Sequence, residues 1–352
     1  MRLVFTRDLI PGMLTGGEVT DVAGAVKLLK QGICLTQSQI TKLQNWGVPF
    51  LYLDDGTDYD RIKFSGVDMI KINFAKVYQE IMHDVGHMFR YIKKFREVPV
   101  MQMKALADHK ISLLVETIGA LDYLLEMRCH SEHTFQHSLN VAVIAGVLGK
   151  WCGYQGEKLK NLVLAGLLHD IGKVVIPLSI LDKPGYLSSA EFAIIKQHTA
   201  EGYQLVKTSQ QISQDVKLSI LQHHERMDGS GYPAGLAGDE INDGAKVIAI
   251  ADIYEAMTSD RVYRSKMTPF EALNIIADQM FVGLKPEICL TFFDNMRNYL
   301  TGSSVALSNG LEAKVIAFDA KEKHVTRPIL YVQNGTCIDL QKEALRIVGV
   351  YG

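Results

Sequence analysis

Cysteine is scarce in this sequence of 352 residues, and no two of its five cysteines form a CxxC pair. The five are scattered along the chain, at Cys34, Cys129, Cys152, Cys289 and Cys337. An odd, scattered set favours neither a disulfide framework nor a thiolate zinc site. The simplest expectation is therefore a reduced protein in the cytoplasm.

Long apolar runs and an excess of one charge are also absent. The longest apolar run, Val141–Leu148, is far shorter than the roughly 18 residues that a membrane-spanning helix needs. Met1–Leu14 lacks a basic stretch followed by a long apolar core, so we expect no signal peptide. A net charge of -2 gives no global attraction to DNA or RNA, so an anionic ligand must meet local positive charge.

The pattern of apolar residues divides the chain into segments. Short apolar runs separated by turn residues predict a small α+β domain at 1–73, with strands at Leu3–Phe5 and Phe50–Leu53. A helical period then predicts a linker at 74–129 and a helical domain at 130–300. The fold class is therefore mainly α, and a regulatory role is one expectation for the first domain.

The last segment, 301–352, changes character again. Asn309-Gly310 and Asn334-Gly335 each lie between two apolar runs. Asn-Gly in that setting is a strong hairpin signal because both residues tolerate a positive φ. We therefore expect a small module of two β-hairpins at this end.

Two amphipathic helices are expected in the linker at 74–129, separated by Pro99, which breaks a helix. One carries apolar residues from Val77 to Phe95 and the other from Ile111 to Leu125. They could form a stalk or a homodimer contact, or pack against their own domain. The residues alone leave both alternatives open.

Histidines gather in the helical domain. An apolar helix at Leu159–Leu168 leads into His169-Asp170, and Gly172 allows a sharp exit. His137 and His198 lie on other apolar helices, and His223-His224 ends a third.

Asp252 interrupts the apolar run Val247–Ala251, where an unpaired carboxylate would cost several kcal/mol. A metal ion can partner many imidazoles and carboxylates at once. A ligand set without thiolate suits Fe, Mn, Zn or Ni. The histidines and aspartates on successive helices therefore predict a metal site. His83 and His87, by contrast, point to the polar side of their helix and are read as solvated.

These motifs resemble the HD-GYP subfamily of the HD phosphohydrolase superfamily over about 130–300. They stand at His137-Ser138, His169–Lys173, His198–Gly202, His223–Pro233, Ala251–Arg261 and Tyr263-Arg264. The resemblance implies an all-helical HD-type bundle with two or three divalent ions, often iron or manganese. It also implies hydrolysis of cyclic di-GMP to pGpG or onward to GMP.

The resemblance carries a ligand set over to this chain. The residues that match the family's metal ligands are His169, Asp170, His198, His223, His224 and Asp252, with Asp170 as the carboxylate that bridges two ions. His137 matches a further position, used where a third ion is present. His133, one helical turn earlier, stands where some relatives carry a glutamate and is a candidate nitrogen ligand.

Substrate contacts are expected around this centre. Lys173 is placed either to contact the phosphate and help the leaving group, or to face the helix dipole as a terminal cation. Gly231 allows close backbone approach to a phosphate, and Tyr232 offers a ring and a hydroxyl. Arg261 and Arg264, with Lys266 as a weaker third, suit contact with phosphate oxygens.

Three functions remain open from the sequence. The first is a metal-dependent cyclic di-GMP phosphodiesterase that lowers second-messenger levels in a bacterium. The second is a non-catalytic receptor that binds the dinucleotide and signals through protein contacts. The third is a nucleotide phosphohydrolase of the wider superfamily, against which Gly231-Tyr232-Pro233 argues. Nothing in the residues distinguishes guanine from adenine, so cyclic GMP-AMP also stays open.

Overall fold

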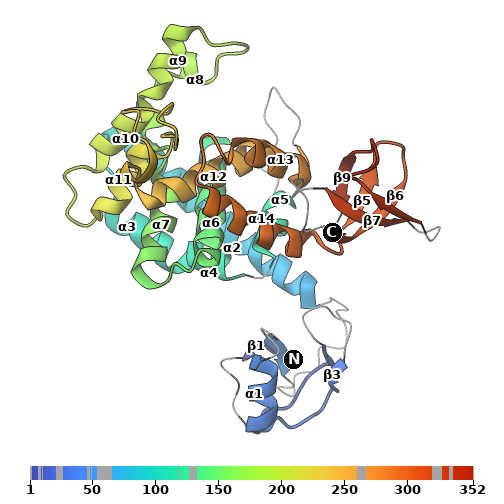
Figure 1. The fold of residues 1–352 in the computed structure, drawn as a ribbon. Coiled ribbons are helices and arrows are strands. Elements are labelled where there is room, and N and C mark those ends of the chain that lie inside the picture. Colours follow the sequence, from blue (N-terminus) through green and yellow to red (C-terminus); the bar gives the residue numbers. More distant parts are fainter. Residues whose placement is uncertain are drawn as a thin grey trace. The chain divides into compact units, whose positions relative to one another are not determined.

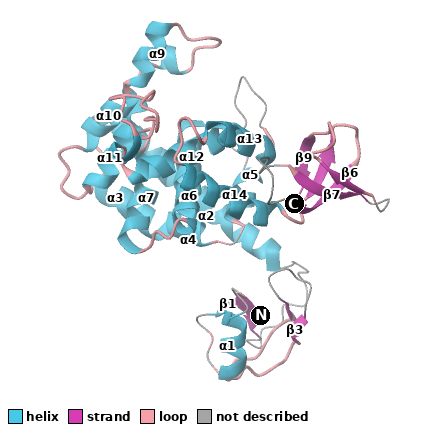
Figure 2. Ribbon diagram, in the orientation of Figure 1, coloured by secondary structure: helices cyan, strands magenta, loops and turns pink. Residues whose placement is uncertain are grey.

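A computed structural model describes most of the chain, and its helices and strands are shown in Figures 1 and 2. The described residues are 2–6, 9, 11–20, 27–45, 48, 50–53, 66–117, 119–126, 133–259, 267–318, 327–332 and 336–351. They fall into two compact units, Met1–Met69 and Ile70–Gly352. This division does not separate the expected linker or C-terminal module from the helical domain, so the four-segment domain scheme stays a prediction.

The first unit combines two small antiparallel sheets with one helix. Its elements are β1 (Arg2–Phe5), β2 (Val19–Thr20), β3 (Lys27–Leu29), α1 (Gln37–Asn45) and β4 (Phe50–Leu53). β1 pairs with β4, and β2 pairs with β3. Thr36 and Gln39 exchange hydrogen bonds at the start of α1, which satisfies backbone donors of its first turn. Both expected strands are present, and α1 supplies the helical part of the expected α+β domain.

α2 (Gly66–Phe95) begins in the last four residues of the first unit and continues into the second, and it is the first of the two expected long helices. The prediction of a second, continuous helix was wrong. That region is divided into α3 (Val100–Ala105), the π-helical η2 (Leu106–Ile111), α4 (Ser112–Glu116) and α5 (Ala120–Glu126). Thr117 is extended and Gly119 has a positive φ, so the helix stops between α4 and α5.

Both linker helices pack against their own unit. Ile81 and Val85 of α2, with Ile111 and Leu114 of the following segment, belong to the buried core that the bundle helices form. The structure therefore favours packing within the chain over an exposed stalk.

The bundle itself surrounds α6, α7 and α12, which pack against one another. Its elements are α6 (His133–Trp151), α7 (Gly156–Leu168), η3 (Ile171–Val175), α8 (Leu178–Leu181), α9 (Ser189–Lys196), α10 (His198–Val206), α11 (Gln214–Gln222), η4 (Gly238–Glu240), α12 (Asp243–Thr258), α13 (Pro269–Gln279) and α14 (Pro286–Leu300). Side-chain caps start several of them: Ser188 and Thr268 form capping boxes at α9 and α13. The chain is thus mainly α, as expected.

A five-stranded antiparallel sheet follows the bundle. It has the order β8-β7-β6-β5-β9, with β5 (Ser304–Leu307), β6 (Glu312–Phe318), β7 (Pro328–Val332), β8 (Cys337–Asp339) and β9 (Ile347–Tyr351). Both expected hairpins are present, although Asn334-Gly335 lies outside the described residues. The sequence did not predict β9. Phe318 of β6 stacks near Phe270 of α13, so sheet and bundle share a core.

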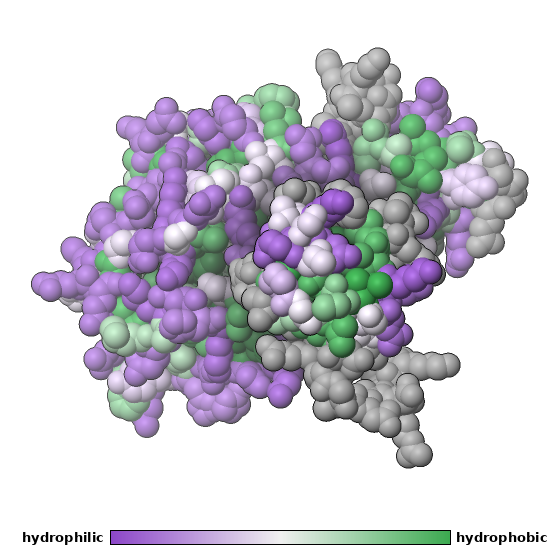
Figure 3. All heavy atoms as spheres, turned by 90° about the horizontal axis from the view of Figure 1, so that it is seen from below, coloured by the Kyte–Doolittle hydropathy of each residue, from purple (hydrophilic) through white to green (hydrophobic). Residues whose placement is uncertain are grey.

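The surface of the helical bundle is mostly hydrophilic on the face shown in Figure 3. None of the described helices combines the length and the apolarity needed to cross a bilayer.

Candidate metal centre

The end of α7 delivers the first two side chains of the centre. His169 follows the last residue of α7 and keeps helical backbone angles, and Asp170 comes next. Their exposed fractions are 0% and 1%. The imidazole Nδ1 of His169 lies 2.8 Å from the carbonyl oxygen of Gly166, one turn earlier. The helix itself therefore fixes the orientation of this ring.

Three imidazoles share one arrangement. Nδ1 of His198 lies 2.7 Å from the carbonyl of Ile195, and Nδ1 of His223 lies 2.8 Å from that of Ile220, as in His169. A carbonyl only accepts hydrogen bonds, so Nδ1 carries the proton in each ring and Nε2 keeps its lone pair. All three Nε2 atoms are thereby prepared to bind a cation.

The side chains form two groups. Ligand atoms of Asp170, His198, His223 and His224 lie within 4.8 Å of one another, as do those of His137, His169 and Asp252. The sequence placed His137 at a further position, whereas the structure joins it to His169 and Asp252. α6, α7, α10, α11 and α12 meet here, so residues more than 100 positions apart share one site.

Asp170 lies between the two groups. Its Oδ1 is 3.3 Å from Nε2 of His198 and 4.0 Å from Nε2 of His223. Its Oδ2 is 3.3 Å from Nε2 of His137 and 3.4 Å from Nε2 of His169. One carboxylate thus offers one oxygen to each group, which is the arrangement of a bridging ligand.

Divalent cations fit this set of donors. Nε2 of His198 and Nε2 of His223 face each other at 3.3 Å, and the Nδ1–H group of each ring donates a hydrogen bond to a backbone carbonyl. Two lone pairs at that distance repel unless a cation or a shared proton lies between them. Oδ1 of Asp170 is buried and has no hydrogen-bond partner, which is costly without a cation.

Burial sets the protonation of most of the imidazoles. It lowers the pKa of His198, lowers that of His223 well below the usual range, and lowers that of His224 to about 3. These three rings are neutral near pH 7, which is the form that binds a metal ion.

His137 behaves differently from the other rings. Burial opposes its charge, but Glu255 and hydrogen bonds to Asp170 and Asp252 outweigh burial and raise the pKa of His137 well above its usual value. Without a metal ion, His137 is therefore a cation among carboxylates.

The two aspartates stay ionised. Burial alone would raise the pKa of Asp170, but the Lys173 ammonium and the His169 ring outweigh it and hold the pKa well below its usual range. The His137 ring does the same for the pKa of Asp252. Lys173 Nζ donates to Oδ2 of Asp170 at 2.5 Å, so its ammonium lies at the edge of the centre.

The glycine-rich loop after α11 covers one side of the centre. The Tyr232 ring stacks on His224, with centroids 4.7 Å apart and an interplanar angle of 28°. A Cβ on Gly231 would lie 2.5 Å from the Cα of Glu225, so only glycine fits there. Lys196 places its ammonium 5.1 Å from the Tyr232 ring centroid, a cation that sequence reasoning missed.

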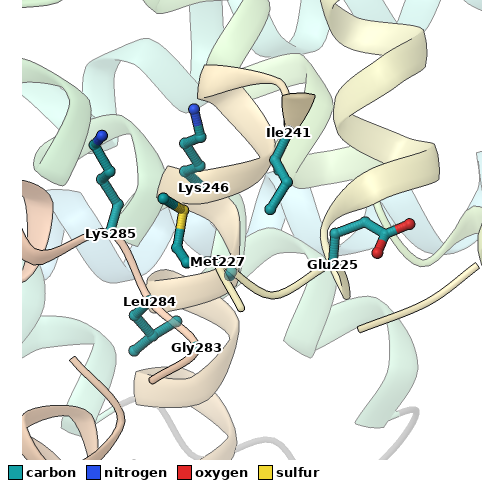
Figure 4. A pocket seen from close by; sticks show the side chains of 8 residues that line it. Glu225, Met227, Ile241, Lys246, Gly283, Leu284 and Lys285 are labelled. Carbon is teal, nitrogen blue, oxygen red and sulfur yellow. The ribbon is translucent and has the colours of Figure 1, made fainter. Parts of the chain in front are cut away.

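Glu225 anchors the same loop. It is 3% exposed, and its carboxylate accepts hydrogen bonds from the backbone of Ala234 at 2.7 Å and Leu236 at 3.0 Å. Figure 4 shows a small pocket beside it, where Lys246 and Lys285 extend in the same direction and Glu225 points away from them. Its volume of about 10 Å³ admits a single water molecule, so it is no substrate site.

Some expected site residues cannot be placed. Arg261, Arg264 and Lys266 lie in 260–266, outside the described residues. His133 begins α6, but its side chain is not described either. Sequence reasoning also missed Glu255, although its position three residues after Asp252 puts both carboxylates on one helix face.

Comparison with known proteins agrees with this geometry. Residues 121–281 match the model of a family described as HD domain. A cyclic di-GMP phosphodiesterase of Pseudomonas aeruginosa is 33% identical over 227 residues, which are 64% of this chain and 54% of that protein. A 3'3'-cGAMP-specific phosphodiesterase of Vibrio cholerae is 41% identical over 154 residues, covering 44% of this chain and 35% of its own length. The chain thus spans about half the length of the first relative and less of the second.

A solved structure supports the fold. An HDG"Y"P protein from Bdellovibrio bacteriovorus superposes with a TM-score of 0.54 and 17% identity, covering 84% of this chain and 99% of that one. At 17% identity, this similarity supports the fold alone. The family match shows that residues 121–281 form an HD domain, and the clustered His169-Asp170 pair, followed by Gly231-Tyr232-Pro233, agrees with the HD-GYP type of that domain.

Proposed function

We propose that this protein is a metal-dependent phosphodiesterase that hydrolyses cyclic di-GMP to pGpG, GMP or both. The observation that carries the proposal is the position of Asp170, with one oxygen facing His198 and the other facing His137. Such a carboxylate would bridge two divalent ions. The imidazole and carboxylate donors favour iron or manganese, with zinc and nickel as alternatives.

The proposed ligands are the two groups of side chains. His198, His223 and His224 would hold one ion, His137, His169 and Asp252 the other, and Asp170 both. His133 stays a proposed nitrogen ligand, one helical turn before His137. Two ions bound there would supply a water of lowered pKa and would neutralise charge on the phosphoryl oxygens.

Lys173 would act on the substrate. Its side chain is 27% exposed and its ammonium lies at 2.5 Å from Oδ2 of Asp170. From that position it would bind a phosphoryl oxygen or stabilise the charge on the leaving 3′-oxygen. Its ion pair with Asp170 supports this role over a purely helix-terminal one, because the ammonium faces the centre.

The rest of the substrate would lie against the glycine-rich loop. Tyr232 would stack on a base or donate its hydroxyl to a phosphate, and Gly231 would let the backbone approach the phosphate closely. Arg261, Arg264 and Lys266 would supply further positive charge. The N-terminal residues 1–73 would then form a regulatory domain.

Cyclic GMP-AMP is a second candidate substrate. The observation in its favour is the 41% identity with the 3'3'-cGAMP-specific phosphodiesterase of Vibrio cholerae. The 33% identity with two cyclic di-GMP phosphodiesterases extends over more of this chain, which favours the first substrate.

The test is a hydrolysis assay with resolved products. Protein loaded anaerobically with Fe²⁺ or Mn²⁺ receives cyclic di-GMP or cyclic GMP-AMP. We expect pGpG or GMP from the unaltered chain and no turnover from Asp170→Asn, because an amide nitrogen cannot bridge ions. Asp84→Asn is the control, since Asp84 pairs with Lys110 on the surface. Tight binding without product would favour the receptor, and turnover of other nucleotides alone would favour the wider superfamily.

A further inference from the structure

A chain of buried hydrogen bonds leads from α2 to the metal centre. The Tyr78 hydroxyl donates to Oδ1 of Asn140 at 2.7 Å, and Nδ2 of Asn140 donates to Oε1 of Glu255 at 3.1 Å. The other carboxylate oxygen of Glu255 meets Nδ1 of His137 at 2.5 Å. Three helices, α2, α6 and α12, thus contribute to one path that ends at a proposed ligand.

Each group in this path has one workable orientation. Glu255 only accepts, so Asn140 must turn its NH₂ toward it and its carbonyl oxygen toward Tyr78. Ser259 donates to the same Oε1 at 2.6 Å, which holds the carboxylate from the other side. His137 must then donate from Nδ1, and its Nε2 faces Asp170 and Asp252 at 3.3 and 3.2 Å.

Burial makes the path costly to break. Tyr78, Asn140 and Glu255 are 0%, 4% and 3% exposed. Water therefore has little access to replace a lost partner, and an unsatisfied buried group costs about 1–3 kcal/mol. Without the Tyr78 hydroxyl, the carbonyl oxygen of Asn140 would have lost this hydrogen-bond donor. The orientation of the Asn140 amide, and with it the hydrogen bond to Glu255, would then be less well fixed.

We propose that Tyr78 is a positioning residue of the metal centre, acting through Asn140 and Glu255 on the His137 imidazole. The proposal rests on the proposed function, because His137 matters only if the centre binds ions. It gives α2 a direct role at the site. α2 begins at Gly66 in the first unit and continues into the second, so a residue on the connecting helix sets the geometry of a ligand.

The experiment is a calorimetric titration of the full chain with Mn²⁺. The unaltered chain should bind two ions. Glu255→Gln should weaken the binding of the ion at His137 by about 10–100-fold, which is the usual effect of losing a hydrogen-bond partner of a ligating histidine. Tyr78→Phe removes only a hydroxyl and should lower the affinity for the same ion by a factor on the order of ten. The ion held by His198, His223 and His224 should bind as before in both variants.

Tyr123→Phe is the matched control, because Tyr123 is a buried tyrosine that packs on the same Phe74 ring as Tyr78. It should leave both affinities unchanged. Thermal melts of the metal-free variants show whether each still folds.

The outcomes separate the two proposals. Equal Mn²⁺ binding by the unaltered chain and a folded Tyr78→Phe variant would overturn the positioning role and leave the proposed function standing. An equal loss of affinity for both ions in Tyr78→Phe would also overturn the positioning role. So would the same loss of affinity in Tyr123→Phe, because either result would indicate a general loss of packing. An unaltered chain that binds no divalent ion would overturn both proposals.

Discussion

Gly172 lies against the backbone of His198, so close that a Cβ on Gly172 would be 1.9 Å from the carbonyl oxygen of His198. The same atom would be 2.5 Å from the backbone nitrogen of Gly202. No ordinary contact is that short, so η3 and α10 can pack this closely only with glycine at 172. This contact brings His198 beside Asp170, two residues before Gly172.

Gly172→Ala should therefore damage both stability and the metal centre. The added methyl must push η3 away from α10, and overpacking of this kind costs about 1–3 kcal/mol or more. We expect a lower free energy of unfolding in denaturant and weaker Mn²⁺ binding. Gly17→Ala is the control, because a Cβ there meets nothing within 4 Å. A Gly172→Ala variant with unchanged stability and metal affinity would show that the packing is misjudged.

Binding of the two ions should release different numbers of protons. His198, His223 and His224 have lowered pKa values and are already neutral, whereas His137 has a raised pKa and carries a proton near pH 7. The ion at His137 must displace that proton, so its affinity should fall about tenfold per pH unit below the pKa of His137. Asp170 and Asp252, with lowered pKa values, stay ionised over this range.

Calorimetry in buffers of different ionisation enthalpy measures this proton release. One ion should bind with little release near pH 7, and the other with release of about one proton. Equal release for both ions would contradict the assignment of the charged imidazole to His137.

Glu225→Gln should affect substrate binding more than the chemical step. The carboxylate holds the loop that carries Tyr232 by accepting from Ala234 and Leu236. An amide can accept only one of these bonds and turns its NH₂ toward the other donor, at a cost of about 1–3 kcal/mol. We expect a higher KM with a smaller change in kcat. Glu240→Gln, which changes an exposed carboxylate bonded to Ala237, should leave KM unchanged. A fall in kcat alone would contradict this role.

Arg264→Ala should weaken substrate binding and leave metal content unchanged. A charge-assisted hydrogen bond to phosphate contributes about 1.5–3 kcal/mol, so KM should rise by about tenfold or more. Metal analysis of the purified variant is the second measurement. Loss of metal from this variant would show that Arg264 supports the ligands rather than the substrate.

Much of the bundle was predictable because its helices are rich in apolar residues, and α6 and α12 are buried almost all round. The apolar helix before His169 and the placement of Asp252 in an apolar run both led to the centre, and both side chains lie in it. The Asn309-Gly310 signal predicted the β5–β6 hairpin because that signal is local.

Long-range features could not be predicted in the same way. The assignment of His137 to the group of His169 and Asp252 depends on how α6, α7 and α12 pack, which no local pattern encodes. The break between α4 and α5 at Thr117 is a local backbone event that overrides the apolar period. Glu255 was missed because a carboxylate that contacts an imidazole instead of an ion differs from other helical glutamates only in its spacing of three residues from Asp252.

The most direct test of the whole account is anomalous X-ray diffraction from crystals of the Mn²⁺- or Fe²⁺-loaded protein. We predict two peaks, one on each side of the Asp170 carboxylate, within ligand distance of His198 and His169 respectively. An anomalous map of fully loaded crystals with no peak beside Asp170 would contradict the account.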